Sequence, residues 1–172
     1  MRRLLLLRHA EAAPTGSAPD RDRPLALRGR DAASLMGDYL AENGLRPDLA
    51  LVSPARRTRE TWDLVREALG DVPARFEEGL YESRAETLLS LVQGADASLG
   101  TLLLVGHNPG LAELGLTLAG EGENASKIAG NFPPAALAVL KLDGEAWTDL
   151  QPGTCRLERL VTPKSLGAGE DE

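Results

Sequence analysis

The stretch that decides the fold is the N-terminal Met1-Arg-Arg-Leu-Leu-Leu-Leu-Arg-His-Ala10. Residues 4–7 form a continuous apolar run, and a loop rich in Pro, Gly, Ser and Asp begins shortly after His9. A short apolar run bounded by turn signals is typical of a strand that is buried on both faces of a sheet. Such a strand presents Arg8 and His9 at its C-terminal end, where open α/β sheets bind ligands. A cation beside a potential nucleophile at that place indicates phosphate chemistry.

Composition bounds the class of protein. A chain of 172 residues is most simply one domain, and a net charge of -7 argues against nonspecific nucleic-acid binding. Cys155 is the only cysteine, which excludes an internal disulfide and a multi-cysteine metal site, so we expect a small buried hydrophobe there. No run reaches the roughly 18 apolar residues that a membrane span needs, and residues 4–7 are too few for a signal peptide. We expect a soluble, cytoplasmic protein without a membrane partner.

Strand and helix signals alternate along the chain. Apolar runs predict further strands at 49–52, 101–105, 136–142 and 156–161. Helical spacing and stop signals predict helices over 30–43, 54–69, 83–93 and 109–119, with a loop over 121–134. This alternation predicts one α/β domain over 1–162, a three-layer α/β/α sandwich with a mostly parallel central sheet. Residues 163–172 are expected to form a disordered acidic tail.

Capping signals predict where three of the helices begin. Ser53-Pro54 and Asn108-Pro109 each combine an N-cap residue with a proline that suits the first helical position. Residues 83–86, Ser-Arg-Ala-Glu, match a capping box.

The only two histidines of the chain, His9 and His107, occupy equivalent places. Each follows a buried-strand candidate, in Leu-Leu-Leu-Leu-Arg-His and Leu-Leu-Leu-Val-Gly-His. The carboxyl ends of parallel strands meet at one edge of a sheet, so we expect the two rings on the same edge. Histidines without a role in function would not both be expected there, and the pairing favours a functional site.

Helical geometry selects one arginine from the cluster at residues 56–59. At about 100° per residue, Arg57 lies near the apolar face of its helix, whereas Arg56 and Arg59 lie on the opposite side and are expected to be solvated. The first turn of a helix already favours anions, because its backbone N–H groups are free. We therefore expect Arg57 to join Arg8 and the two histidines in a site that suits a phosphate dianion; an arginine that only covers the rim of the core is the alternative.

Three ordered motifs resemble those of the histidine phosphatase superfamily. They are Leu-Leu-Arg-His near the N-terminus, Ser-Pro-x-x-Arg-Thr-x-x-Thr at 53–61 and Val-Gly-His-Asn-Pro-Gly at 105–110. The resemblance covers residues 1–161 and implies a phosphoglycerate mutase-like fold. It also implies a phosphoenzyme mechanism in which His9 is the nucleophile and Arg8, Arg57 and His107 form the phosphate pocket.

The short chain and its Gly-His-Asn-Pro-Gly form resemble the small branch related to bacterial protein-phosphohistidine phosphatases. Ala10 departs from the superfamily motif, which usually has Gly after the histidine. That branch also generally lacks a secure general acid. Glu82 matches the Leu-x-Glu acid of the mutase-like branch and is a possible general acid, with a solvated glutamate as the alternative. Glu11 is expected to point away from the phosphate.

We expect a metal-independent phosphatase without a cofactor, because two histidines far apart in sequence and next to arginines would repel a divalent cation and no third ligand is evident. Imidazole leaves phosphorus more readily than an alkoxide, so an uncertain acid favours phosphohistidine on a protein over a small phosphorylated metabolite. A small-molecule phosphomonoesterase acting on a sugar or nucleotide phosphate at the same site is the alternative. A non-catalytic phosphate-binding module is less favoured, as is a mutase. A dinucleotide site is excluded because the glycine-rich fingerprint is missing.

The chemistry also predicts the state of each histidine. His9 must be neutral to attack phosphorus, and Arg8 and Arg57 should lower its pKa. Its second ring nitrogen is expected to donate to a backbone carbonyl of the N-terminal loop, which would fix the tautomer. A protonated His107 is expected to help the arginines stabilise charge on the phosphoryl oxygens.

Overall fold

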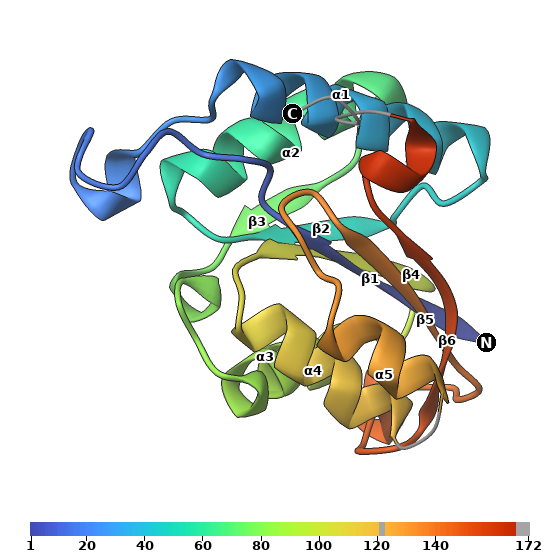
Figure 1. The fold of residues 1–172 in the computed structure, drawn as a ribbon. Coiled ribbons are helices and arrows are strands. Elements are labelled where there is room, and N and C mark those ends of the chain that lie inside the picture. The colour runs from blue at the N-terminus through green and yellow to red at the C-terminus, as the bar shows by residue number, and fades with distance from the viewer. Residues whose placement is uncertain (121–122, 168–172) are drawn as a thin grey trace.

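A six-stranded sheet runs through the centre of the computed structural model, which describes residues 1–120 and 123–167 (Figure 1). The strand order is β3-β2-β4-β1-β5-β6. The bounds are β1 (Arg2–Arg8), β2 (Leu49–Val52), β3 (Ala74–Phe76), β4 (Thr101–Gly106), β5 (Leu137–Leu142) and β6 (Cys155–Val161). The first four strands pair in parallel, whereas β5 is antiparallel to both β1 and β6. Only β5 therefore runs against the common direction, which confirms the mostly parallel sheet.

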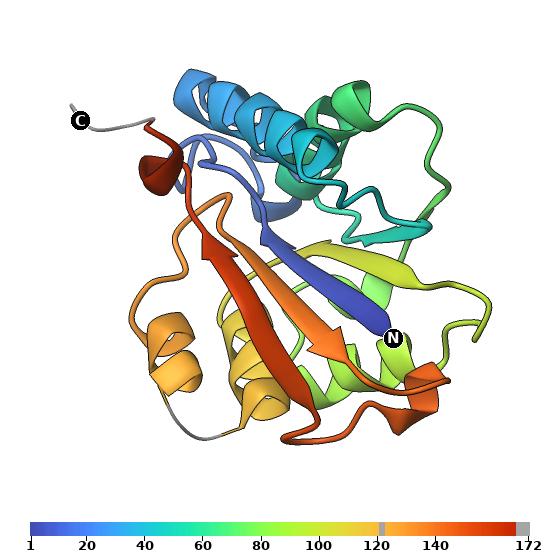
Figure 2. The ribbon, with the colours of Figure 1, turned by 90° about the vertical axis from the view of Figure 1, so that its right-hand side faces the viewer.

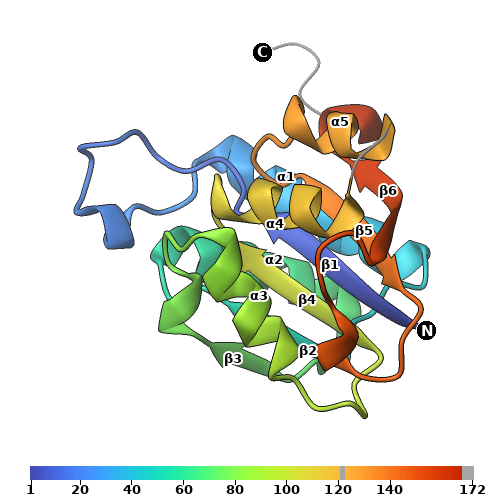
Figure 3. The ribbon, with the colours of Figure 1, turned by 90° about the horizontal axis from the view of Figure 1, so that it is seen from below.

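Helices cover both faces of this sheet. Figures 1 and 2 show α1 (Leu27–Glu42) and α2 (Arg56–Leu69) on one face. Figure 3, from below, shows the opposite face covered by α3 (Ala85–Gln93), α4 (Gly110–Ala119) and α5 (Glu123–Ala129). Short 3₁₀ helices complete the chain: η1 (Asp20–Asp22), η2 (Glu78–Leu80), η3 (Trp147–Asp149) and η4 (Lys164–Leu166). The α/β/α sandwich predicted from the alternation is confirmed.

The leucine run of β1 forms the middle of both hydrophobic layers. Leu4 and Leu6 pack into the cluster beneath α3 and α4, whereas Leu5 and Leu7 pack into the cluster beneath α1 and α2. Successive residues of a strand point to opposite faces, so a strand covered on both sides needs apolar residues at every position. This is why the run is continuous, and it holds the end of β1 in a fixed place.

Three expectations about the chain's course were wrong. The first helix begins at Leu27 rather than residue 30. Part of the expected loop at 121–134 is α5 instead, a seven-residue helix whose main apolar anchor is the buried Ile128; such a helix has little periodic signal. In the expected tail, Lys164–Leu166 forms η4 and Leu166 packs against the cluster beneath α1 and α2. The rest of the tail, 168–172, and residues 121–122 lie outside the described residues.

The helix starts also differ from the capping signals. Helix α2 begins at Arg56, and Ser53 is not its N-cap. No capping box forms at 83–86, since α3 begins at Ala85 and the Ser83 hydroxyl donates to the Tyr81 carbonyl (3.4 Å). Asn108 comes closest to its predicted role, because its Oδ1 accepts the Ala112 N–H of α4 (3.2 Å). The capping signals therefore placed the helix starts within a few residues but did not identify the N-cap residues.

Two smaller expectations concern the interior and the membrane. Cys155 is buried, and burial raises the pKa of its thiol to about 11, as fits a small hydrophobe. Among the described residues, no helix combines the length and the apolar content required to cross a bilayer.

Candidate active site

The pairing of β1 with β4 brings the two histidines together. Arg8 lies in register with Gly106, and the His9 N–H donates to the Gly106 carbonyl (3.0 Å). The residues that follow the two strands are therefore neighbours, and the rings of His9 and His107 are 5.4 Å apart between centroids. Both side chains are buried, with 9% and 6% of each residue exposed. The prediction that they share one edge of the sheet is confirmed.

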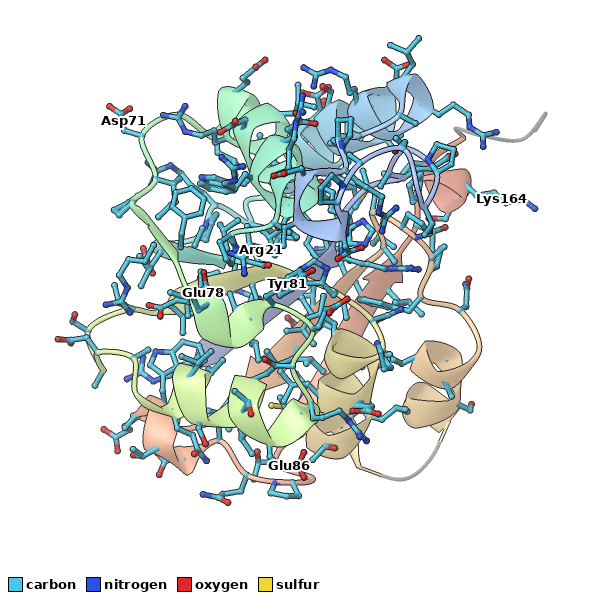
Figure 4. The ribbon with its side chains drawn as sticks, turned by 90° about the vertical axis from the view of Figure 1, so that its left-hand side faces the viewer. Arg21, Asp71, Glu78, Tyr81, Glu86 and Lys164 are labelled. Carbon is cyan, nitrogen blue, oxygen red and sulfur yellow. The ribbon has the colours of Figure 1, made fainter. Side chains whose placement is uncertain are left out.

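A pocket of about 390 Å³ opens at this edge. Figure 4 looks onto this end of the molecule, where Tyr81 and Arg21 lie near the centre. All five residues predicted for the site line the pocket, together with six others. The lining is Arg8, His9, Glu11, Ala12, Asp20, Arg23, Arg57, Glu82, His107, Asn108 and Pro134.

A backbone hydrogen bond fixes the ring of His9. Its Nδ1 lies 2.7 Å from the carbonyl oxygen of Ala10, which can only accept, so Nδ1 carries the proton and Nε2 keeps its lone pair. Burial, opposed by this bond, and the charges of Arg8, Arg57 and Arg23 together lower the pKa of His9 to about 4. His9 is therefore neutral with a free Nε2, the state that a nucleophile requires.

Ala10 fits its position without strain. Among the described residues other than glycine, only Glu82 and Ala135 have a positive φ, so the turn after His9 does not need glycine. The Ala10 side chain is buried, and its N–H donates to the Thr61 hydroxyl (3.0 Å). The departure from the usual glycine is thus accommodated by ordinary backbone geometry.

His107 is held from both ring nitrogens. Its Nδ1 is 3.4 Å from Nη2 of Arg57, which can only donate, and its Nε2 is 2.8 Å from the Ser53 hydroxyl. This pattern places the proton on Nε2, which donates to Ser53. Burial, followed by the charges of His9 and Arg57, lowers the pKa of His107 to about 3. Without substrate His107 is therefore neutral, and the protonated His107 expected during phosphoryl transfer stays a prediction.

Arg57 points inward from the first turn of α2 and is 3% exposed. Its Nη1 donates to the Asp20 carbonyl (2.7 Å) and its Nη2 to the Asp20 carboxylate (3.1 Å). Its Nε is buried with no hydrogen-bond partner among the described residues. Asp20 thus occupies the Nη1–Nη2 edge of the guanidinium and leaves Nε as a donor for an anion. Arg56 and Arg59 are exposed, as the helical geometry predicted.

Asp20 belongs to a loop that we call the strap, residues 12–24. An isolated bridge between Ala12 and Leu25 closes its base, and its tip projects from the body in Figure 1. The carboxylate of Asp20 also accepts hydrogen bonds from Arg23 and from the Tyr81 hydroxyl. The Tyr81 bond, with Arg23 and Arg57, lowers the pKa of Asp20 to about 2, so this carboxylate stays ionised and is no general acid.

A second contact fastens the tip of the strap. Arg21 forms a bidentate pair with Glu78 (3.0 and 2.8 Å), and its guanidinium lies 4.8 Å from the centre of the Tyr81 ring. Figure 4 shows Arg21, Glu78 and Tyr81 close to one another. The strap is therefore attached to the same segment that carries Tyr81 and Glu82.

The sequence missed four residues of the site: Ser53, Asp20, Arg23 and Tyr81. Ser53 lies inside a recognised motif, but its signal was interpreted as a helix cap. Asp20 and Arg23 lie in an aperiodic, charge-rich loop, where no pattern distinguishes site residues from solvated ones. Tyr81 has an edge-on contact with the His107 ring, at 5.5 Å between centroids, that only the tertiary structure reveals.

The two candidate acids line the rim of the pocket rather than its centre. Glu82 is exposed, has a φ of 52° and forms no hydrogen bond with another described residue. Glu11 pairs with Arg28 at 2.8 Å, in agreement with the expectation that it turns away from the phosphate. Among the described residues, no group of three side chains is arranged to hold a metal ion.

Comparison with known proteins identifies the family of this chain. The profile of the histidine phosphatase superfamily (branch 1) matches residues 4–93. An uncharacterized protein of Mycobacterium tuberculosis is 35% identical over 162 residues, which cover 92% of this chain and all of the relative.

Two solved structures are also similar, and both carry a provisional assignment as the phosphohistidine phosphatase SixA. The one from Nakamurella multipartitia superposes with a TM-score of 0.85 at 29% identity, covering 94% of this chain and 96% of its own. The one from Agrobacterium tumefaciens superposes with a TM-score of 0.81 at 32% identity, covering 94% and 98%. The chain belongs to branch 1 of the histidine phosphatase superfamily, and this membership implies phosphatase activity.

Proposed function

We propose that this protein is a phosphohistidine phosphatase that works through a phosphoryl group carried on His9. The observation that carries the proposal is the bond from His9 Nδ1 to the Ala10 carbonyl, which leaves a neutral ring with a free Nε2 in a pocket lined by arginines. A neutral nitrogen nucleophile beside fixed cations is what phosphoryl transfer from a dianion requires.

The reaction proceeds in two displacements. The Nε2 of His9 attacks phosphorus; the Nε2–P bond forms while the bond from phosphorus to the substrate's leaving group breaks, and the leaving group takes a proton from solvent. Water then attacks the phosphorus, the Nε2–P bond breaks, and phosphate and neutral His9 are released. Arg8 and Arg57 stabilise the charge on the transferring oxygens in both steps, each with a buried Nε that has no partner among the described residues.

His107 changes its protonation state when substrate binds. A phosphoryl dianion nearby raises the pKa of both histidines, because an opposite charge favours the protonated form. The Nδ1 of His107 then takes up a proton, loses its contact with Nη2 of Arg57 and donates to a phosphoryl oxygen, while Nε2 keeps its bond to Ser53. The stabilising role expected for His107 is thereby kept, and the charge appears only in the complex.

The carboxyl groups at the site favour phosphohistidine as the substrate. Asp20 is held ionised, Glu11 is paired with Arg28, and Glu82 lies exposed at the rim. An alkoxide leaving group loses about 10²–10⁴-fold in rate without general-acid help, whereas imidazole needs far less. The Agrobacterium neighbour, at 32% identity, is named for the same substrate. We therefore propose a phosphorylated protein as the partner.

A small-molecule phosphomonoesterase is the second candidate, and the position of Glu82 favours it. This glutamate lines the pocket, forms no ion pair with another described residue, and could turn inward to protonate a leaving alkoxide. In that case a sugar or nucleotide phosphate would occupy the same four-residue site.

The phosphoenzyme is tested by labelling. Wild-type protein mixed with ³²P-labelled phosphoramidate should acquire an acid-labile, base-stable phosphoryl group, and His9→Ala should acquire none. Arg56→Ala, which removes an exposed arginine from the same helix turn as Arg57, should label normally. A label that persists in His9→Ala would remove His9 as the nucleophile.

The substrate is tested by a panel with matched variants. A phosphohistidine peptide should be hydrolysed faster than sugar, nucleotide and aryl phosphates, and Glu82→Gln and Glu11→Gln should leave that rate unchanged. Activity should also persist in a chelator, since the mechanism uses no metal. A selective loss of ester hydrolysis in Glu82→Gln, with esters as the better substrates, would establish the phosphomonoesterase instead.

A further inference from the structure

A second, larger cavity of about 940 Å³ adjoins the phosphate pocket. The two cavities share Glu11 and Pro134 in their linings, so one opens beside the other. We call the larger one the side groove. Its other lining residues come from three segments distant in sequence: Arg28, Asp31 and Ala32; Asn131 and Pro133; and Thr162 to Ser165. Figure 2 shows these segments meeting at one end of the sheet.

One wall of the side groove is tied directly to the nucleophile. Residues 133–134 precede Ala135, whose N–H donates to the carbonyls of both Arg8 (3.1 Å) and His9 (3.0 Å). A ligand that binds against Pro133 and Pro134 is therefore held at a fixed distance from the ring of His9.

The opposite wall is held by its own hydrogen bonds. The Ser165 hydroxyl donates to the Thr162 carbonyl (2.8 Å) and accepts the Thr162 N–H (3.0 Å), while the Ser165 N–H donates to the Thr162 hydroxyl (3.0 Å). Leu166 anchors this turn to the cluster beneath α1 and α2. The side groove is therefore formed before any ligand binds.

The lining does not suit a second compact anion. Of its two cations, Arg28 is paired with Glu11, and Asp31 adds a negative charge. Within the described part of the chain neither Lys164 nor Asp31 forms an ion pair, so one charge of each sign borders the groove without a described partner. Prolines and Ala32 supply apolar surface, and Asn131, Thr162 and Ser165 supply polar groups. A polypeptide has apolar, amide and charged groups side by side, and it can therefore contact all of these surfaces. A small metabolite bound at His9 would not extend into the groove.

We propose that the side groove binds the polypeptide that flanks the phosphohistidine of a protein substrate. This inference rests on the proposed function and deepens it. It states that selectivity for a protein over a small phosphoramidate is determined by a surface separate from the phosphate pocket. Figure 4 places Lys164 at the margin of this face, apart from Arg21 and Tyr81, so the groove extends recognition away from the chemistry.

The experiment compares two substrates that share the same reacting bond. Free phosphohistidine and a 15-residue peptide with one central phosphohistidine are both prepared with phosphoramidate. Ala32→Trp fills the groove, and Lys164→Glu reverses the positive charge at its border. Each should raise KM for the peptide about fivefold or more, the loss expected for one interface contact, and leave kcat/KM for free phosphohistidine unchanged. Arg66→Glu makes the same charge change on an exposed part of α2 that lines neither cavity, and should alter neither substrate.

Equal effects on both substrates, or none on either, would overturn the groove proposal. Calorimetry of the phosphopeptide with full-length His9→Ala separates the two proposals, since it needs no turnover. Binding that weakens with Ala32→Trp and Lys164→Glu supports the groove even if the wild type hydrolyses no phosphohistidine, in which case the proposed function alone fails. Absence of peptide binding to His9→Ala would reject the groove.

Discussion

At the scale of single residues, the site is a set of polar groups whose protons are placed by burial and by fixed partners. His9 and His107 are the only histidines, and each uses one ring nitrogen as a donor to a neutral acceptor, the Ala10 carbonyl or the Ser53 hydroxyl. Neighbouring arginines donate but cannot accept, so they favour neutral rings. The result is a pair of uncharged imidazoles inside a cationic pocket.

This arrangement predicts unusual titration of both rings. NMR titration of the two Cε1–H signals should show neither ring protonated near pH 6.5, because the pKa of His9 is lowered to about 4 and that of His107 to about 3. Saturating inorganic phosphate should move at least one titration upward, by attraction between imidazolium and anion. Two ordinary titrations near pH 6.5 in folded protein would contradict the burial and charge assigned to the site.

A second prediction at this scale concerns Asp20, for which the direction of the change in phosphate affinity distinguishes two roles. Asp20→Asn removes a negative charge beside an anion site, so charge alone predicts tighter binding of phosphate. Loss of the carboxylate also removes the hydrogen bonds that Asp20 accepts from Nη2 of Arg57 and from Arg23. These bonds orient the two arginines toward the phosphate. We expect the second effect to dominate and the inhibition constant of phosphate to rise about tenfold, the usual loss for a charge-assisted bond.

The matched control is Tyr81→Phe, which removes the other hydrogen bond to Asp20 and changes no charge. It should shift phosphate inhibition in the same direction by a smaller factor. Tighter phosphate binding in Asp20→Asn, at unchanged thermal stability, would mean that Asp20 competes with the substrate instead of positioning Arg57.

At the scale of elements, close backbone approaches bring the site together. Gly110, the last residue of the motif at 105–110, opens α4 directly against the segment that carries Tyr81 and Glu82. A Cβ at Gly110 would lie 2.1 Å from the Ser83 carbonyl oxygen, a distance that no side chain tolerates. The motif therefore needs glycine for packing, in addition to placing His107.

Gly110→Ala should consequently push the 81–83 segment away from α4. We expect a loss of roughly 1–3 kcal/mol in unfolding free energy, as for other overpacked sites, together with a reduced kcat/KM as Tyr81 moves from Asp20. Chemical denaturation and steady-state kinetics measure the two effects. Gly130→Ala is the control, since nothing lies within 4 Å of its added Cβ; equal behaviour of the two variants would contradict the close contact.

At the scale of the whole molecule, the buried neutral histidines link stability to pH. In the unfolded chain a histidine binds a proton below about pH 6.5, whereas folded His9 does so only below about 4 and His107 below about 3. Between pH 6.5 and 4 the unfolded state holds more protons, so the free energy of unfolding must fall as the pH falls.

For His9 alone this loss is of order 3 kcal/mol by pH 4. Urea unfolding of wild type and of a His9→Gln, His107→Asn double variant, measured between pH 7 and 4, tests it. The double variant should lose much less stability over this range. The low pKa of Asp20 adds a loss in the same direction only below about pH 3.8, outside this window. Parallel curves for the two proteins would contradict the neutral state of the rings.

The sequence by itself determined the sandwich, the mostly parallel sheet and five of the residues that line the phosphate pocket: Arg8, His9, Arg57, Glu82 and His107. These features depend on strong, local patterns: continuous apolar runs, helical periodicity around Arg57, and histidines placed directly after strands. The backbone bond from His9 was also predictable, because a neutral nucleophilic ring must donate its proton somewhere. Short elements such as α5 and η4 were missed, since one or two apolar residues give no period.

Only the tertiary structure decided how those residues are partnered. Ser53 reads locally as a helix cap, yet its hydroxyl accepts from His107, 54 residues away in the chain. Asp20, Arg23 and Tyr81 join the site through contacts between the strap and the segment before α3, and no periodic pattern records such contacts. The protonation state of His107 likewise follows from burial and from the position of Arg57. Local sequence specifies which of the longer elements form, whereas hydrogen-bond partners and pKa values depend on which distant groups the packed fold brings within a few ångströms.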